Sequence, residues 1–223
     1  MSRLHLLIAC SISVFLAQPL AAARAKTAPA IVILLEGEPL YFEGGHRHKL
    51  DLGQALGKDC EIDTPKGASV HLVLANGSSL VIAERSRLKL WTLDLPPARP
   101  RYQAKLMDGR VGLFADPEDQ EINFDLGGDG ATVLFKKARF ELALQEGEVR
   151  VTVDQGSVQF GPESKKRLEE VGALYSCGWY PERLEKANRL PKREINEFHQ
   201  RWQRSLMIHG QRKELVKNLR SLR

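Results

Sequence analysis

The sequence has few of the features that mark an enzyme or an integral membrane protein. Beyond residue 25, no apolar run approaches the roughly 20 residues that a membrane-spanning helix needs. No Ser-His-Asp, Cys-His or metal-ligand spacing is present, so we expect no catalytic residue, no cofactor and no metal site. His46 and His48 have no third ligand nearby in the sequence, and we expect them in a solvated loop or an edge strand. These absences favour a binding protein over an enzyme.

Cysteine is also scarce, with three residues in a chain of 223. Cys10 lies in an N-terminal segment that we expect to be removed, which leaves Cys60 and Cys177. An even number of cysteines in an exported protein favours a disulfide, because oxidising compartments keep such bonds intact. A bridge between Cys60 and Cys177 would tie the β body to the segment that follows it. Two separate buried thiols are the alternative.

The first 25 residues have the three parts of a secretory signal peptide. Arg3 precedes an uncharged apolar run at 6–17, and an alanine-rich stretch follows it. The run is too short to span a bilayer, and we expect cleavage after Ala23 or Ala25. A lipidated Cys10 is the alternative interpretation. We therefore expect a soluble protein that is exported to the periplasm.

The stretch 68–90 predicts the centre of the fold, with two alternating strands joined at Asn76-Gly77. Asn-Gly is a strong hairpin signal, since both residues tolerate positive φ. A second hairpin is predicted across the turn 145–147. Alternate apolar residues share a face in each hairpin, namely Val70, Leu72 and Leu74 in the first and Phe140, Leu142, Leu144, Val149, Val151 and Val153 in the second. The pattern predicts an all-β roll or sandwich of many short, mostly antiparallel strands with a C-terminal α-helical extension.

Several short motifs occur in an order that resembles a FecR domain. The motifs are Leu52-Gly53-Gln54-Ala55-Leu56, Ala75-Asn76-Gly77-Ser78, Leu88-Lys89-Leu90 and Gln155-Gly156-Ser157-Val158. The resemblance extends over residues 31–160, most of the chain that remains after cleavage. It implies an all-β domain that lies outside the cytoplasm.

Two departures limit what this resemblance implies. The family often places Gly-Thr before the phenylalanine of a late strand, where this chain has Lys137-Ala138-Arg139-Phe140. FecR regulators resemble anti-sigma proteins in which a cytoplasmic helical segment and a membrane span precede this domain. Here we expect a cleavable signal peptide in their place. We therefore do not transfer the regulatory role on the resemblance alone.

The C-terminal residues 191–223 predict a basic helix that begins at Pro191. Nine Lys or Arg residues and three Glu residues give this segment a charge of +6 (9 − 3). We expect the first half to dock on the β body through Phe198 and Trp202. The second half is either solvated or free to contact an anionic membrane surface or a partner helix. The candidate interaction residues of the whole helix are Phe198, Trp202, Arg212, Lys213, Lys217 and Arg220.

The expected organisation has four parts: a signal peptide at 1–25, a FecR-like β domain at 26–162, a connecting segment at 163–190 and the basic helix at 191–223. The expected function is that of a non-enzymatic, exported module that binds another protein of the bacterial cell envelope, in signalling or envelope assembly. The alternative is a protein that binds a glycan, another envelope polymer or an anionic membrane surface. Nucleic acid is not an expected partner, because the chain is exported.

Overall fold

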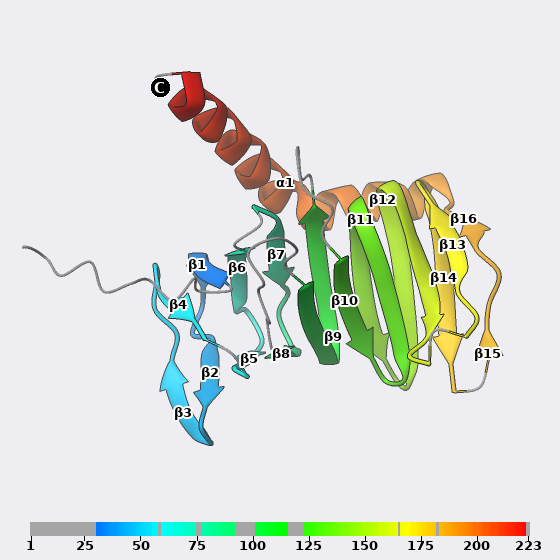
Figure 1. The fold of residues 1–223 in the computed structure, drawn as a ribbon, viewed down its shortest axis with the longest axis horizontal. Helices are drawn as coiled ribbons and strands as arrows, with labels where there is room; N and C mark the ends of the chain where they lie inside the picture. The colour runs from blue at the N-terminus through cyan, green and yellow to red at the C-terminus, as the bar shows by residue number, and fades with distance from the viewer. Residues whose placement is uncertain are drawn as a thin grey trace, which may run out of the picture.

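The computed structural model describes residues 30–57, 59–74, 77–91, 101–115, 123–164, 166–181 and 183–221. These residues form a β body with one long C-terminal helix (Figure 1). The arrangement confirms the predicted all-β fold with a C-terminal α-helical extension. The predicted signal peptide, with Cys10, and Asn76 of the first predicted turn lie outside the described residues.

All sixteen strands of the described residues belong to one hydrogen-bonded sheet. The first eight are β1 (Ala30–Glu36), β2 (Leu40–Glu43), β3 (His46–Lys49), β4 (Ala55–Leu56), β5 (Glu61–Thr64), β6 (Ser69–Leu74), β7 (Ser79–Ile82) and β8 (Ser86–Trp91). The other eight are β9 (Arg101–Ala115), β10 (Asn123–Gly128), β11 (Ala131–Gln145), β12 (Glu148–Pro162), β13 (Glu169–Gly172), β14 (Tyr175–Tyr180), β15 (Arg183–Leu184) and β16 (Asn188–Arg189). The pair β9–β10 is parallel, whereas hairpin pairs such as β6–β7 and β11–β12 are antiparallel.

Three long strands, β9, β11 and β12, run through two halves of this sheet. One half contains their residues 109–115, 138–145 and 148–153, together with β7 and β14. The other contains their residues 101–108, 131–135 and 156–162, together with β8, β10 and β13. The first is extended by β6, β1 and β4, and the second by β5, β2 and β3. We call them the helix-side half and the opposite half, because the C-terminal helix packs on the first.

Bulges and glycines bend the long strands where the two halves meet. The register between β11 and β12 shifts between Phe135 and Ala138 and again after Arg139. A bulge leaves an extra residue unpaired and bends its strand. Gly109 in β9 and Gly156 in β12 have φ angles of 85° and 80°, and a Cβ on either would lie 2.3 Å from a backbone oxygen. Glycine is therefore required at both bends.

The larger of the two hydrophobic clusters in the described residues is built by side chains from both halves. Val70, Leu72 and Leu74 of β6 are buried, as predicted for one face of that strand. The predicted facing positions of the second hairpin are also confirmed, since its register pairs Phe140, Leu142 and Leu144 with Val153, Val151 and Val149, and all six are buried. Leu106 and Phe160 of the opposite half join the same cluster. The helix-side half therefore has one face in the core and leaves its outer face for the helix.

Residues 163–190, which we expected to be a connecting segment, contribute strands to the same sheet. β13 and β14 both pair with β12, and β15 and β16 pair with β14. Val171 and Cys177 are buried, and Trp179 packs against the core. The β body therefore continues to β16. These strands were not predicted because the sequence of this region does not alternate clearly between apolar and polar residues. They form mainly because they pair with β12.

The predicted disulfide between Cys60 and Cys177 is not formed, because both residues are free, buried thiols. The carbonyl of Cys60 accepts a hydrogen bond of 2.9 Å from the backbone N–H of Leu90 in β8, whereas Cys177 is paired with Val151 from its position in β14. Three strands, β9, β11 and β12, lie between β8 and β14 along the sheet. The two cysteines thus belong to segments that pair with different strands, and a disulfide forms only where two Cα atoms come within about 7 Å. Burial raises the pKa of each thiol to about 12.

Candidate functional site

The helix α1 (Lys192–Ser221) docks on the outer face of the helix-side half through its first turns. It begins at Lys192, one residue after the predicted start at Pro191. Phe198 and Trp202, one helical turn apart, are buried against Val81 of β7 and Phe114 of β9. The rings of Phe114 and Trp202 meet edge to face, with centroids 6.1 Å apart. This confirms the predicted docking of the helix through Phe198 and Trp202.

The indole of Trp202 lies directly over Gly112 of β9. A Cβ at Gly112 would stand 3.1 Å from three carbons of the indole ring. Any larger residue would therefore push the helix outward or displace the ring. The flat glycine surface sets how closely α1 approaches the sheet.

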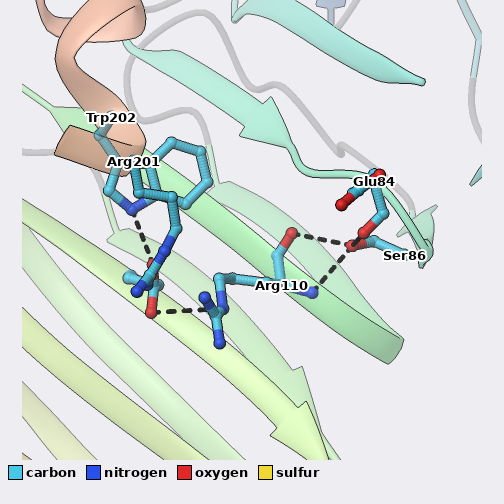
Figure 2. A network of polar contacts seen from close by, with 6 residues as sticks. Glu84, Ser86, Arg110, Arg201 and Trp202 are labelled. Atoms are coloured by element: carbon cyan, nitrogen blue, oxygen red, sulfur yellow. Dashed lines mark hydrogen bonds and ion pairs between the residues drawn. The ribbon is translucent and has the colours of Figure 1, made fainter. Parts of the chain in front are cut away.

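A buried carboxylate on β11 links the helix to the sheet. The Oε2 atom of Glu141 accepts hydrogen bonds from Trp202 Nε1 at 2.7 Å and from Arg201 Nη1 at 2.5 Å. Its Oε1 lies 3.4 Å from Arg110 Nε, which has no hydrogen-bond partner of its own. Figure 2 shows the side chains of Arg201 and Arg110 converging on this carboxylate, with Trp202 beside them. One negative charge is therefore shared by two guanidinium groups.

The backbone of Arg110 is fixed by a serine at the bend of β9. Ser86 Oγ accepts a hydrogen bond from Arg110 N at 2.9 Å and lies 3.1 Å from both Arg110 O and Glu84 O, which it can reach as a donor (Figure 2). Burial lowers the pKa of Arg110, while the nearby Glu141 opposes that shift. Arg110 is thus positioned by Ser86 at its backbone and by Glu141 at its guanidinium group.

A second polar contact lies beneath the middle of α1. Ser205 is buried and its Oγ lies 3.3 Å from Nε2 of His71, a buried residue of β6. Burial lowers the pKa of His71 to about 4, so the imidazole is neutral at neutral pH. Because side chains alternate along β6, His71 lies on the face opposite Val70 and Leu72, and the helix covers that face.

One hydrogen bond and one ion pair flank the docked turns. His199 Nε2 lies 2.7 Å from Asp154 Oδ1 in β12, and Arg204 contacts Glu36 at the end of β1. The side chains of His199 and Arg204 are 49% and 61% exposed, so each pair contributes little compared with the buried contacts. Their positions nevertheless show that α1 crosses the outer face from β12 to β1.

A groove of about 550 Å³ lies between the first turns of α1 and the outer face of β9, β11 and β12. Arg110, Ala143 and Arg150 are register neighbours on these three strands. The small side chains of Ala143 and Thr152 form the floor of the groove. Leu190, Pro191 and the first turns of α1 form one wall. The groove exists because small residues lie between two arginines.

Beyond the docked turns, α1 continues past the β body (Figure 1). A helix rises about 1.5 Å per residue, so the turns after Ile208 extend roughly 20 Å. The predicted interaction residues Arg212, Lys213, Lys217 and Arg220 lie on these turns, but their side chains are outside the described part of the chain. Within that part, no helix combines the length and apolar character needed to cross a membrane.

The histidine pair lies far from this helix in the sequence and on a different part of the sheet. His46 and His48 are exposed on β3, an edge strand that pairs only with β2 among the described residues. Their rings are 6.5 Å apart, and Tyr41 stacks on His48 at 5.0 Å. Among the described residues, no group of three or more His, Cys, Asp or Glu side chains could hold a metal ion.

Four contributors to the site were not singled out from the sequence: Arg110, Gly112, Glu141 and His71. A detectable signal existed for one of them, because Glu141 is a charged residue inside the apolar strand Phe140–Leu144. A carboxylate within a predicted strand is expected either to be exposed to solvent or to be paired with a hydrogen-bond donor in the interior. Only the position of α1 identifies the partner.

Comparison with known proteins gives the family of the β body. Residues 60–159 match the model of the family described as FecR protein. This matched region is a FecR domain. The match confirms the resemblance seen in the motifs, and the FecR domain includes Arg110, Gly112 and Glu141 but not α1. Among curated proteins, none matches the chain.

Two crystal structures of similar fold are described as candidate anti-sigma factors from Parabacteroides distasonis ATCC 8503. One, at 1.65 Å resolution, is 15% identical with a TM-score of 0.50 and covers 62% of this chain and 63% of its own. The other, at 2.50 Å, is 14% identical with a TM-score of 0.49 and covers 61% and 62%. The likeness thus spans less than two thirds of those proteins. At 15% identity it shows a shared fold around the FecR domain.

Proposed function

We propose that this protein is an exported, non-enzymatic FecR module that binds another protein of the bacterial cell envelope, in signalling or envelope assembly. The match of residues 60–159 to the FecR family carries this proposal. The shared fold with a candidate anti-sigma factor supports a role in signalling. The signal-peptide pattern of the first 25 residues supports export to the periplasm.

The projecting end of α1 is the part of the molecule that best suits a partner. The buried Phe198 and Trp202 are occupied by the protein's own β body, so they are unsuited to an external contact. Residues 209–221 continue past that body with four basic residues and one acidic residue, Glu214. Long-range attraction between opposite charges speeds association and selects an acidic partner surface.

In-cell photo-crosslinking tests this proposal. A photoreactive residue at Lys217 is expected to capture one envelope protein reproducibly. The matched control places the same residue at Lys66, an exposed position in the turn between β5 and β6. Capture of the same proteins from both positions, or of none from Lys217, contradicts binding through the terminal turns.

Binding to an anionic membrane surface is the second candidate, favoured by the net charge of residues 209–221, which is +3 (4 − 1). A glycan or another envelope polymer is a further alternative. Capture of lipid from Lys217 without a protein supports the membrane. Retention on insoluble cell-wall material, unchanged in high salt, supports the polymer.

A further inference from the structure

The outer face of the helix-side half carries two charge clusters of opposite sign within the same groove. At one end, Glu141 lies between Arg110 and Arg201, so this cluster has a net charge of +1 (2 − 1). At the other end, Arg150 pairs with both Glu148 and Glu185, so that cluster has a net charge of −1 (1 − 2). The groove is thus polarised along its length.

The remaining charges around the groove leave this polarity in place. Arg193 and Glu197 pair with each other at 2.8 Å on the exposed rim. Glu194 lies in the first turn of α1 and offsets the positive end of the helix dipole. The net effect is one end that attracts an anion and one that attracts a cation.

Backbone register gives the distance between the strands that carry these two ends. Arg110 and Arg150 stand on either side of Ala143, two strand spacings apart. Two spacings amount to roughly 10 Å. A peptide residue spans at most about 3.5 Å, so three extended residues span a comparable length.

The groove also has the shape and the unused hydrogen-bonding capacity for a bound molecule. Its volume of about 550 Å³ lies within the range of ligand sites, roughly 300–1,000 Å³. Ala143 and Thr152 keep the floor low, while Leu190 borders the groove with an apolar side chain. The side chains of Arg110 and Arg201 are 26% and 34% exposed, so both guanidinium groups are partly open to an anionic acceptor in the groove.

We propose that this groove binds a short zwitterionic peptide of about three residues. Its carboxylate lies beside Arg110 and Arg201, on the groove side of Glu141, and its ammonium lies beside Glu148. The peptide backbone crosses the floor at Ala143. A single amino acid is too short to reach both ends, and an unbranched dicarboxylate meets repulsion at Glu148. This ligand site is separate from the projecting turns of α1 and does not depend on the partner that those turns bind.

Trialanine is the probe, and its binding is followed by backbone amide chemical shifts of the purified protein. The expected result is saturable shifts at Ala143 and Thr152. N-acetyl-trialanine amide, which has no charge, is expected to bind at least about tenfold more weakly, the equivalent of 1.4 kcal/mol. Trialanine without saturable shifts, or equal binding of the blocked peptide, overturns the proposal.

Two variants separate the site from a general loss of structure. Ala143→Leu fills the floor without changing a charge, and it is expected to abolish the shifts while the rest of the spectrum stays folded. Glu148→Gln is expected to weaken trialanine but not N-acetyl-trialanine, which lacks the ammonium. Unchanged binding in Ala143→Leu, or equal loss of both peptides in Glu148→Gln, contradicts the assignment. If Ala143→Leu does not fold, the Glu148→Gln comparison alone decides the outcome.

Discussion

Replacing Glu141 with glutamine tests how α1 is held on the FecR domain. The side chain of Glu141 is only 7% exposed and accepts hydrogen bonds from Trp202 and Arg201. A hydrogen bond to a charged group contributes about 1.5–3 kcal/mol. The 34% exposure of Arg201 reduces its share through solvent screening, and the glutamine oxygen retains one acceptor for the indole. We therefore expect Glu141→Gln to weaken helix docking by about 1–2 kcal/mol.

Hydrogen exchange of the helix amides 195–206 measures this effect directly, because exchange there requires the helix to open. A loss of 1–2 kcal/mol corresponds to exchange about 5–30 times faster. Glu141→Leu also leaves the indole N–H buried without an acceptor, so we expect a larger loss of about 2–4 kcal/mol. The matched control is Glu197→Gln, which removes the exposed pair with Arg193 and is expected to cost less than about 0.5 kcal/mol. Helix exchange in Glu141→Gln that equals the control would refute the reasoning.

Three further predictions concern packing, pH and the cysteines. Gly112→Ala should accelerate exchange of the helix amides and lower the unfolding free energy by about 1–3 kcal/mol, whereas Gly172→Ala, where a Cβ meets nothing within 4 Å, should behave like wild type. The folded pKa of His71, about 4, lies below its ordinary value of 6.5, so its contribution is present above pH 6.5 and is lost as the pH falls toward 4, by up to about 3 kcal/mol. Denaturant titrations should show a flatter pH dependence for His71→Gln over this range, and parallel curves would contradict the burial argument. Because Cys60 and Cys177 are free, buried thiols, a reductant should leave the melting temperature of the protein unchanged. A thiol reagent should react fully only after unfolding. A lower melting temperature in the presence of reductant would instead indicate a disulfide between the two cysteines.

The fold was predictable wherever one strand face is apolar. The alternation of Val70, Leu72 and Leu74 predicted an inner face because a two-residue repeat matches the pleat. The helix was predictable from Phe198 and Trp202, which lie four residues apart after Pro191. Such patterns can be read from the local sequence because each strand or helix buries its own row of apolar side chains.

The remainder of the fold depends on contacts between distant residues. Residues 163–190 lack a strong alternation, and their strands exist because β12 offers an unpaired side. The pairing of Cys60 with Cys177 failed as a prediction because a cysteine count carries no information on strand order. Glu141 contacts Arg201, which is 60 residues further along the chain, and Gly112 contacts Trp202, which is 90 residues further along. Both became site residues only because α1 packs back on the sheet. Such pairings are set by topology and not by local pattern.

The three long strands have a consequence for how the protein can be cut or redesigned. Each of β9, β11 and β12 supplies hydrogen-bond partners on both sides of the bend. Neither half can therefore be produced alone as an independent unit. A chain that stops at Phe135 also lacks residues 138–145 and 148–153, which pair in the centre of the helix-side half. Unfolding of the β body is expected to be a single cooperative transition, with the same midpoint reported from Trp179 on one half and from Tyr41 on the other.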